Sequence, residues 1–202
     1  MNQGQVIIFA RAPQIGVGKR RLASAVGDRK AFDFYNENLQ RLIDELSEGS
    51  WQLHVAVASE PEQHHPLFDG LSVIVQPEGD LGHRMSAVLA QLSGTARLIV
   101  GSDIPDLNCT HVSEALAALS NHQLVFGPAF DGGFWGVGCS SNYSPNAEFM
   151  RDVRWSGPNA LADTLGTIDP NLSVAQVVRL FDVDDLASYE KYQEKKRKPK
   201  TG

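Results

Sequence analysis

The stretch LIVGSDIPDL, residues 98–107, joins an apolar run directly to two carboxylates. Its first three residues are typical of a buried strand, which we expect over residues 96–101. In an open sheet of parallel strands, ligands bind beyond the carboxyl ends of the strands. The stretch therefore predicts a central strand that delivers Asp103 to a binding crevice, whereas Asp106 or Asn108 caps the helix that follows.

Around this stretch, apolar strand patterns alternate with helical patterns along the chain. The predicted strands cover residues 5–10, 51–59, 71–76, 96–101, 122–127, 134–138 and 175–183. The predicted helices cover residues 28–49, 82–94, 110–121 and 185–196, a further one begins near Gly157–Pro158, and Asp28, Thr110 and Ser156 are candidate N-caps. This alternation predicts a single α/β domain over residues 1–190, with a mostly parallel sheet and helices on both faces.

Composition narrows the class of protein. The 202 residues are 42% hydrophobic and 21% charged, as in an ordinary soluble globular protein. No apolar segment approaches the roughly 20 residues that a bilayer span needs, and the first residues do not resemble a secretory signal. Cys109 and Cys139 are too few for a disulfide framework or a zinc site, so we expect two small buried thiols in a reducing cytoplasm.

The net charge of −6 is unevenly distributed. Residues 191–202 form a basic tail with six basic residues and one acidic residue, so that residues 1–190 carry a charge of −11. An acidic body argues against nucleic-acid binding, and the segment RAPQIGVGKRR (11–21) concentrates four of its basic residues. This local cluster indicates a small anion as the ligand, whereas the tail is interpreted as a solvated terminus without a function of its own.

The loop RAPQIGVGKRRLA (11–23), which follows the first strand, is a candidate phosphate site. Its glycines permit close approach of a ligand, and Arg11, Lys19 and Arg21 could hold phosphates by charge-assisted hydrogen bonds. A P-loop is excluded, because a Pro and an Arg stand where that motif needs Gly and then Ser or Thr. The alternative is an exposed basic loop that opens a helix, but its place at the ligand edge of the sheet favours phosphate binding.

Three more acidic segments lie at the same expected edge. Asp80 in QPEGDLGHRM is either a site residue, together with Arg84, or a helix cap. Asp131 in GPAFDGGFWGVG lies either in a plain hairpin turn or in a pocket that meets a sugar hydroxyl or a metal. Asp184 in FDVDDL is a candidate metal ligand next to a helix cap, and a cation bound with nucleotide phosphates needs only one or two carboxylates.

In their order along the chain, these motifs resemble a family of bacterial glycosyltransferase-like proteins in the nucleotide-diphospho-sugar transferase superfamily, which includes the arsenosugar-biosynthesis glycosyltransferases. The matching segments are FARAPQIGVGKRRLA, QPEGDLGHRM, GSDIPDL, GPAFDGGF, RWSGP and FDVDDL. The resemblance covers nearly the whole chain and implies a GT-A-like, Rossmann-like fold that binds a nucleotide with Mg²⁺ or Mn²⁺. Arg20 departs from the usual Thr and His83 from the common Glu.

The resemblance also implies roles for individual residues. Residues implied in nucleotide and phosphate binding are Arg11, Pro13, Gly16, Lys19, Arg21, Asp80 and Arg84. Asp103 corresponds to the metal-site carboxylate and Asp131 to the acid on the acceptor side. The two are therefore the candidate catalytic residues, Asp103 through the metal and Asp131 as the base that activates the acceptor.

Three functions remain open at this point. The first is a metal-dependent glycosyltransferase with a nucleotide-diphospho-sugar donor and an unknown small-molecule acceptor. The second is a nucleotidyltransferase that joins an NTP to a phosphorylated small molecule and releases pyrophosphate, since fold analogy does not separate the two chemistries. The third is a nucleotide-binding protein without catalytic activity. In each case we expect a cytoplasmic protein without a nucleic-acid partner or a membrane span, and the oligomeric state stays open.

Overall fold

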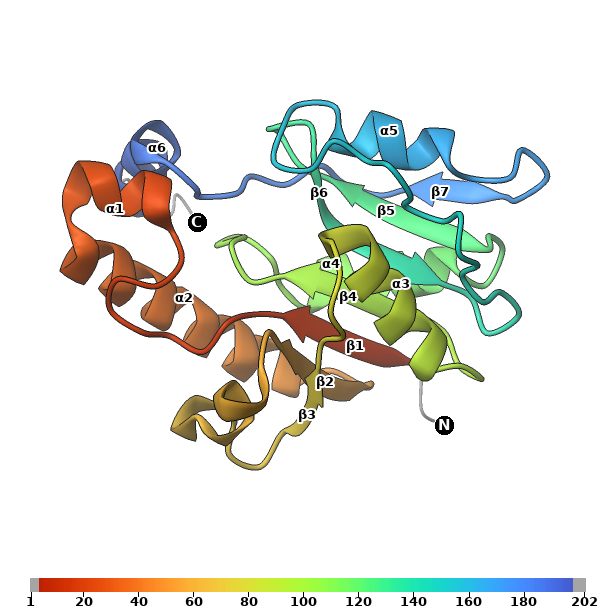
Figure 1. Cartoon of the computed structure of the whole chain (residues 1–202), viewed down its shortest axis with the longest axis horizontal. Coiled ribbons are helices and arrows are strands. Elements are labelled where there is room, and N and C mark those ends of the chain that lie inside the picture. Colours follow the sequence, from red (N-terminus) through yellow and green to blue (C-terminus); the bar gives the residue numbers. More distant parts are fainter. Residues whose placement is uncertain (1–3, 198–202) are drawn as a thin grey trace.

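One seven-stranded sheet organises the molecule (Figure 1). The computed structural model describes residues 4–197 and places the strands at β1 (Gln5–Phe9), β2 (Gln52–Val57), β3 (Ser72–Val75), β4 (Arg97–Gly101), β5 (Leu124–Pro128), β6 (Phe134–Cys139) and β7 (Val174–Gln176). Their order is β3-β2-β1-β4-β6-β5-β7. Strand β6 runs antiparallel to both of its neighbours and the other pairs are parallel, which confirms the predicted mostly parallel sheet.

Six α-helices and two short 3₁₀ helices connect the strands in the described part of the chain. They are α1 (Arg20–Val26), α2 (Asp28–Ser47), η1 (Glu60–His64), η2 (Pro66–Phe68), α3 (Leu81–Gln91), α4 (Cys109–Ala118), α5 (Ala160–Gly166) and α6 (Leu186–Arg197). Helix α1 begins inside the segment 11–23 that the sequence indicated as a loop. Its pattern is weak, because Leu22 is its one buried residue, and Gly27 (φ 88°) separates it from α2.

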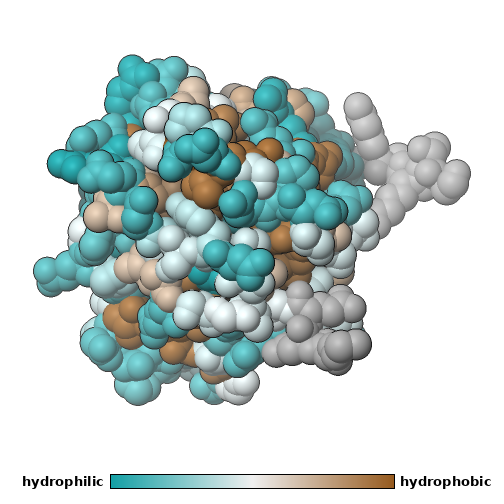
Figure 2. Space-filling model, turned by 90° about the vertical axis from the view of Figure 1, so that its right-hand side faces the viewer, coloured by the Kyte–Doolittle hydropathy of each residue, from teal (hydrophilic) through white to brown (hydrophobic). Residues whose placement is uncertain are grey.

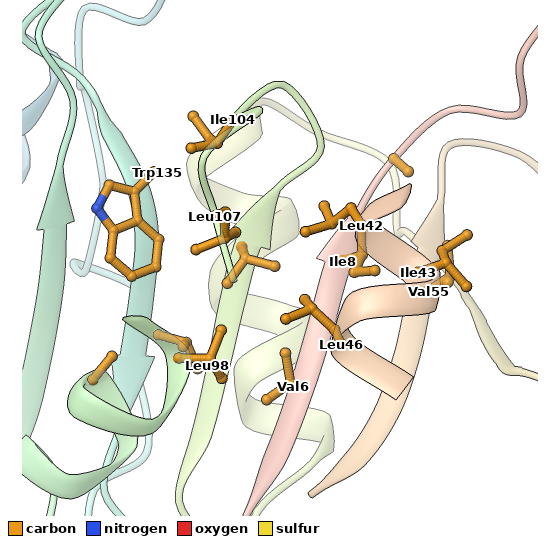
Figure 3. Packing of buried hydrophobic residues seen from close by; sticks show 14 of the residues in the cluster. Val6, Ile8, Leu42, Ile43, Leu46, Val55, Leu98, Ile104, Leu107 and Trp135 are labelled. Carbon is orange, nitrogen blue, oxygen red and sulfur yellow. The ribbon is translucent and has the colours of Figure 1, made fainter. Parts of the chain in front are cut away.

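Helices cover both faces of the sheet, as predicted. Side chains of β1 alternate between the faces, so that Val6 and Ile8 pack with α2 and α4, whereas Ile7 packs with α3 and α5. Figure 3 shows the first of these layers, in which Leu42 and Leu46 of α2 lie against β1. Each face therefore has its own apolar core.

At α3, α4 and α5, two predicted helix caps are wrong and two alternatives are confirmed. Helix α4 is capped by Asn108, whose Oδ1 accepts hydrogen bonds from the amides of residues 110 and 111 at 3.0 and 3.2 Å. Thr110 is therefore not the cap, because the helix begins before it. Ser156 does not cap α5 either, since that helix begins only at Ala160. Asp80 caps α3 and accepts from the amide of residue 83 at 2.8 Å.

Asp28 and Asp106 also differ from the predicted capping roles. Gly27 occupies the cap position of α2, and Asp28 is the first helical residue. The carboxylate of Asp106 does not cap a helix and instead accepts a hydrogen bond from Lys195 Nζ at 2.6 Å. This ion pair joins the start of α4 to α6.

The C-terminal segment is more structured than the tail interpretation suggests. Residues 191–197 continue α6, and residues 198–202 of the predicted tail lie outside the described residues. Tyr189 and Tyr192 of α6 pack edge to face on Phe34 of α2, at 5.5 and 5.3 Å between ring centroids. Helix α6 thus lies against α1 and α2, as Figure 1 shows.

The predicted last strand is shorter than expected. Strand β7 ends at Gln176, and beyond it Leu180 forms a single bridge with Ala129. The chain leaves the ladder where the Nε1 of Trp135 donates to the carbonyl of Val178 at 2.9 Å.

The surface mixes apolar and hydrophilic side chains, and one of the two cysteines is less buried than expected. Over the face in Figure 2, apolar side chains form small patches between hydrophilic ones. Within residues 4–197, no helix combines the length and the apolar character that a membrane crossing requires. Cys139 is buried, Cys109 is half-buried, and both are free thiols.

Candidate functional site

A cleft of about 540 Å³ opens beyond the carboxyl ends of β1 and β4. These strands are neighbours in the sheet. From β1 the chain continues to β2 on one side, and from β4 it continues to β5, which lies beyond β6 on the other side. Such a switch point is where open α/β sheets bind ligands, because the loops diverge there. Polar and charged residues on the cleft wall are Arg11, Lys19, Tyr35, Gln76, Arg84, Ser102, Asp103, Asp131, Ser156, Asp182 and Asp184.

The ammonium group of Lys19 lies at the centre of the polar and charged residues of this cleft. Its Nζ lies 2.8 Å from Asp103 Oδ2 and 2.8 Å from Asp184 Oδ1, and it donates a third hydrogen bond to the carbonyl of Val183 at 2.5 Å. The Lys19 side chain is only 6% exposed, whereas each of the two carboxylate side chains is 36% exposed. One cation therefore bridges the end of β4 and the segment before α6.

Backbone conformation directs Lys19 to this position. Gly16 and Gly18 have φ values of 77° and 75°, and Lys19 itself has φ 44° and ψ 35° at the start of α1. A left-handed conformation costs a residue with a side chain about 1–2 kcal/mol. The hydrogen bonds and ion pairs of Lys19 offset this cost, so that loop geometry and charge pairing support each other.

The charges of this centre stabilise one another. Burial alone lowers the pKa of Lys19, but the charges of Asp103 and Asp184 outweigh it, and the pKa lies above its ordinary value. Burial raises the pKa of Asp184, but Lys19 and Arg21 outweigh it, so that this pKa lies below its ordinary value. Arg21, from α1, donates directly to Asp184. At neutral pH Lys19 and Asp184 are therefore both charged.

A second acidic pair lies on the same cleft. Asp131 closes its own turn by accepting from the amide of Gly133 at 2.8 Å, as the hairpin alternative predicted. Asp182 is half-buried, and burial together with the charge of Asp131 raises its pKa to about 6. The sequence missed Asp182 as a cleft residue, although FDVDDL contains it, because nothing in that motif separates it from Asp184.

Tyr35 is another cleft residue that the sequence did not indicate. Its hydroxyl accepts from the amide of Arg11 at 3.0 Å and donates to the carbonyl of Arg11 at 2.9 Å. Burial and the charge of Asp103 raise the pKa of Tyr35 to about 12. The residue fixes the first loop to α2, but in the sequence it is simply one apolar position of a helical pattern.

Two glycines allow the chain segments beside the cleft to pack closely against one another. A Cβ on Gly82 would lie 2.4 Å from the carbonyl oxygen of Met150 and 2.8 Å from the ring of Trp155. Gly132 has φ 91°, and its Cβ would lie 2.1 Å from the carbonyl oxygen of Pro158. Trp155 packs edge to face on a Phe of β6 at 6.2 Å. These close approaches bring the motifs QPEGDLGHRM and GPAFDGGF against RWSGP.

The structure brings together six of the predicted site residues and leaves four outside the cleft. Those on the cleft wall are Arg11, Lys19, Arg84, Asp103, Asp131 and Asp184. Pro13 is buried, Gly16 is exposed, Arg21 faces Asp184 from α1, and Asp80 caps α3. The roles of all ten residues stay predictions.

The donor set fits a divalent cation bound together with phosphates. Within residues 4–197 no cluster of three or more His, Cys, Asp or Glu side chains is arranged to hold a metal. However, Asp103 and Asp184 already converge on one positive charge, the ammonium of Lys19. Mg²⁺ in nucleotide sites commonly uses one or two carboxylates and completes its shell with phosphates and water.

Comparisons with known proteins identify a family and solved structures that share the fold. The family described as "Uncharacterized protein conserved in bacteria (DUF2064)" matches residues 42–157, more than half of the chain. A crystal structure of a proposed nucleotide-diphospho-sugar transferase from Desulfovibrio desulfuricans G20 has a TM-score of 0.85 at 25% identity, and the match covers 99% of this chain and 90% of that one. None of the curated proteins matches the chain.

Two proteins from Mycobacterium tuberculosis share the fold at lower identity. Rv0371c in complex with manganese has a TM-score of 0.58 at 13% identity, with 96% of this chain and 99% of that chain covered. Glucosyl-3-phosphoglycerate synthase in complex with Mn²⁺, UDP and glucosyl-3-phosphoglycerate has a TM-score of 0.55 at 14% identity, with 95% and 76% covered. The GT-A-like fold that the motifs predict is confirmed.

Proposed function

The chain belongs to the DUF2064 family, and on this premise we propose that it is a metal-dependent glycosyltransferase with a nucleotide-diphospho-sugar donor. The observation that carries the proposal is the charge arrangement at the switch point, where Lys19 and two carboxylates lie in one cleft. The likeness to the Desulfovibrio protein over nearly the whole chain supports the same chemistry.

The donor's diphosphate would lie beside the first loop. Arg11 and Lys19 bring two positive charges to this side of the cleft, and Arg84 adds a third from α3. Cations placed where negative charge develops on a leaving diphosphate lower the barrier of transfer. Tyr35 would act indirectly, because its two hydrogen bonds hold the backbone of Arg11 in place.

Asp103 and Asp184 would hold Mg²⁺ or Mn²⁺. When bound, such a cation neutralises the leaving diphosphate. Both carboxylate side chains are partly exposed to the cleft, as a site shared with a substrate requires. Arg21 would keep Asp184 in position by its hydrogen bond rather than touch the nucleotide.

The acceptor would lie beside the second acidic pair. We assign the role of acceptor base to Asp131, with Asp182 as its rival. A general base works best when its pKa is near the operating pH, and the pKa of Asp182, about 6, is closer to neutrality than that of an ordinary carboxyl. Replacing each residue by Asn and measuring transfer separately from donor binding distinguishes the two.

Three finer assignments complete the proposal, and the ordered motifs support the first of them. We propose that the chain belongs with the glycosyltransferase-like proteins of the arsenosugar-biosynthesis type. We further propose one catalytic domain over residues 1–190, with residues 191–202 as a basic tail that begins within α6, and a cytoplasmic location.

A nucleotidyltransferase is the second candidate, and the basic first loop favours it. In that reaction the same cations would stabilise the pyrophosphate that leaves an NTP. The purified protein, incubated with Mn²⁺ and either sugar nucleotides or NTPs plus sugar phosphates, separates the two reactions. Release of a nucleoside diphosphate supports glycosyl transfer, and release of pyrophosphate supports nucleotidyl transfer.

All three candidate functions require that the protein binds a nucleotide. A panel of nucleotides and sugar nucleotides in a thermal-shift assay tests this binding first. A ligand present at 100 times its Kd stabilises a protein by about 2.7 kcal/mol. We expect stabilisation that depends on Mn²⁺ and is lost in Asp103→Asn. Binding without turnover under any donor and acceptor combination would instead support the third function, a non-catalytic nucleotide-binding protein.

A further inference from the structure

The ammonium group of Lys19 has no donor left for a phosphate. An ammonium carries three N–H donors. Here hydrogen bonds to the carbonyl of Val183 and to Asp184 use two of them, at 2.5 and 2.8 Å, and the ion pair with Asp103 at 2.8 Å occupies the remaining side of the ammonium. To bind a ligand phosphate, as the proposed function requires, this group has to leave at least one of these acceptors.

The same ammonium group lies where the proposed divalent cation would bind. Its two carboxylate partners are the residues assigned to that cation, Asp103 and Asp184. The side chain of Lys19 is nearly fully buried between them, so it fills the space rather than lining its edge. Two positive centres at one site repel each other, and a second cation therefore has to displace the first.

We propose that Lys19 is an exchangeable internal cation. It neutralises Asp103 and Asp184 in the ligand-free protein, and it moves to the diphosphate of the nucleotide when a divalent cation takes over the two carboxylates. This inference rests on the proposed function, since it assumes the same metal site. Its consequence is that the metal alone binds weakly, because it has to displace a partner that then has nowhere to go.

In this exchange the binding of the metal and the binding of the nucleotide are thermodynamically linked. When the metal frees Lys19, the nucleotide gains a cation, and when the nucleotide holds Lys19, the metal gains two free carboxylates. The two ligands therefore strengthen each other's binding by the same factor. A Lys side chain suits this exchange, because its charge lies at the end of a flexible four-carbon stem.

Mn²⁺ titration of the full chain without nucleotide tests the exchange directly. We expect Lys19→Met to bind Mn²⁺ about tenfold or more tightly than the unmodified chain, within the 5–150-fold range typical of coupled sites. Free Mn²⁺ is measured by electron paramagnetic resonance, so the readout does not depend on activity.

Two control variants separate displacement from a general loss of positive charge. Arg21→Gln removes another cation from Asp184, but from a side chain that is 62% exposed, and we expect a gain in Mn²⁺ affinity below about threefold. Lys195→Met removes an exposed Lys–Asp pair at Asp106, and we expect no change.

UDP and GDP serve as nucleotide probes for the coupling. In the unmodified chain, saturating Mn²⁺ should raise the affinity for whichever probe binds by about tenfold or more, and in Lys19→Met this factor should fall by about tenfold. Lys19→Asn repeats each measurement, because Asn tolerates the left-handed backbone of this position better than Met.

The outcomes distinguish the inference from the proposed function. If Asp103→Asn abolishes Mn²⁺ binding but neither Lys19 variant binds Mn²⁺ more than about threefold more tightly, the exchange is wrong and the metal site stands. The exchange is equally wrong if Arg21→Gln gains as much as Lys19→Met. If Asp103→Asn binds Mn²⁺ like the unmodified chain, the proposed metal site is wrong and the exchange fails with it.

Discussion

The two ends of strand β4 each meet a buried cation, and the two cations are held in different ways. At its first residue, Arg97 is fully buried, and its guanidinium donates only to backbone carbonyls, those of Leu89, Thr95, Ser140 and Tyr143. Beyond its last residue, Asp103 meets Lys19, whose ammonium binds two carboxylates and one carbonyl.

The two cations differ in whether another cation could take their place. Carbonyl oxygens at Arg97 belong to the backbone, so they stay in place as long as the strand and the adjoining turns are folded. Burial lowers the pKa of Arg97, because no carboxylate compensates it, whereas the carboxylates at Lys19 raise the pKa despite burial. A cation held by carboxylates in an open cleft can be replaced by another cation, and one held by backbone in the core cannot.

Removing Arg97 should have the largest effect. Arg97→Met leaves the carbonyls of Leu89, Thr95 and Tyr143 without a donor, and each unsatisfied group costs about 1–3 kcal/mol, so we expect a loss of at least about 3 kcal/mol in the free energy of unfolding. Urea unfolding measures it. As a control, Arg29→Met removes an exposed pair with Asp33 and should cost less than about 0.5 kcal/mol. A loss below about 1 kcal/mol in Arg97→Met would show that these hydrogen bonds contribute little to stability.

A substitution in the wall of the cleft should destabilise the fold nearly as much. Gly132→Ala places a methyl group against the carbonyl of Pro158 in addition to a left-handed backbone, and we expect a cost of about 2 kcal/mol. Gly16→Ala is the matched control, because its φ of 77° is similar but nothing lies within 4 Å of the added Cβ. The control should cost only about 1 kcal/mol. Equal costs in thermal unfolding would show that the contact with Pro158 is unimportant.

Removing Lys19 should cost less than removing Arg97. Asp103 and Asp184 are each partly exposed, so water can replace the ammonium, and we expect Lys19→Met to lose about 1 kcal/mol in urea unfolding. Addition of Mg²⁺ should recover this loss in the variant. If Lys19→Met loses as much stability as Arg97→Met, both cations are structural and the contrast between the two ends of β4 disappears.

The smallest effect should come from an ion pair on the outer surface. Hydrogen bonds and charge from Arg154 lower the pKa of Asp163 to about 2. Because the folded pKa is depressed, the pair stabilises the fold above the unfolded value of about 3.9 and loses this contribution as the pH falls through about 2. Asp163→Asn should therefore lose less stability than the unmodified chain between pH 4 and 2, measured by thermal midpoints. If the thermal midpoints of the two proteins fall in parallel with pH, the ion pair with Arg154 does not stabilise the fold in this way.

The sequence predicted most of the sheet because apolar strands are recognisable from local pattern alone. LIVG at residues 98–101 lies within β4, and the position of Asp103 on the cleft follows from the strand ending there. The N-cap of α3 at Asp80 was predictable for a similar reason, because glycines on either side of the Asp marked the turn. These predictions needed only neighbouring residues.

Predictions that depended on the start of a helix or on distant partners were less successful. Asn108, Thr110 and Ser156 are all good capping residues, and only packing decides which of them meets a helix end. Helix α1 buries a single residue, Leu22, so its pattern resembled a loop. Asp182 and Asp184 look alike in sequence, but the fold places one near Asp131 and the other on Lys19.

By itself, the sequence determined the alternation of strands and helices, the mostly parallel character of the sheet and the edge at which the cleft opens, because periodicity and turn residues act over short distances. The tertiary structure decided the strand order, the antiparallel β6 and the partners of each charge. Lys19, Asp103 and Asp184 come from three distant parts of the chain. Only folding brings them within hydrogen-bond distance, and the predicted phosphate ligand proves to be the cation that already holds the predicted metal ligands.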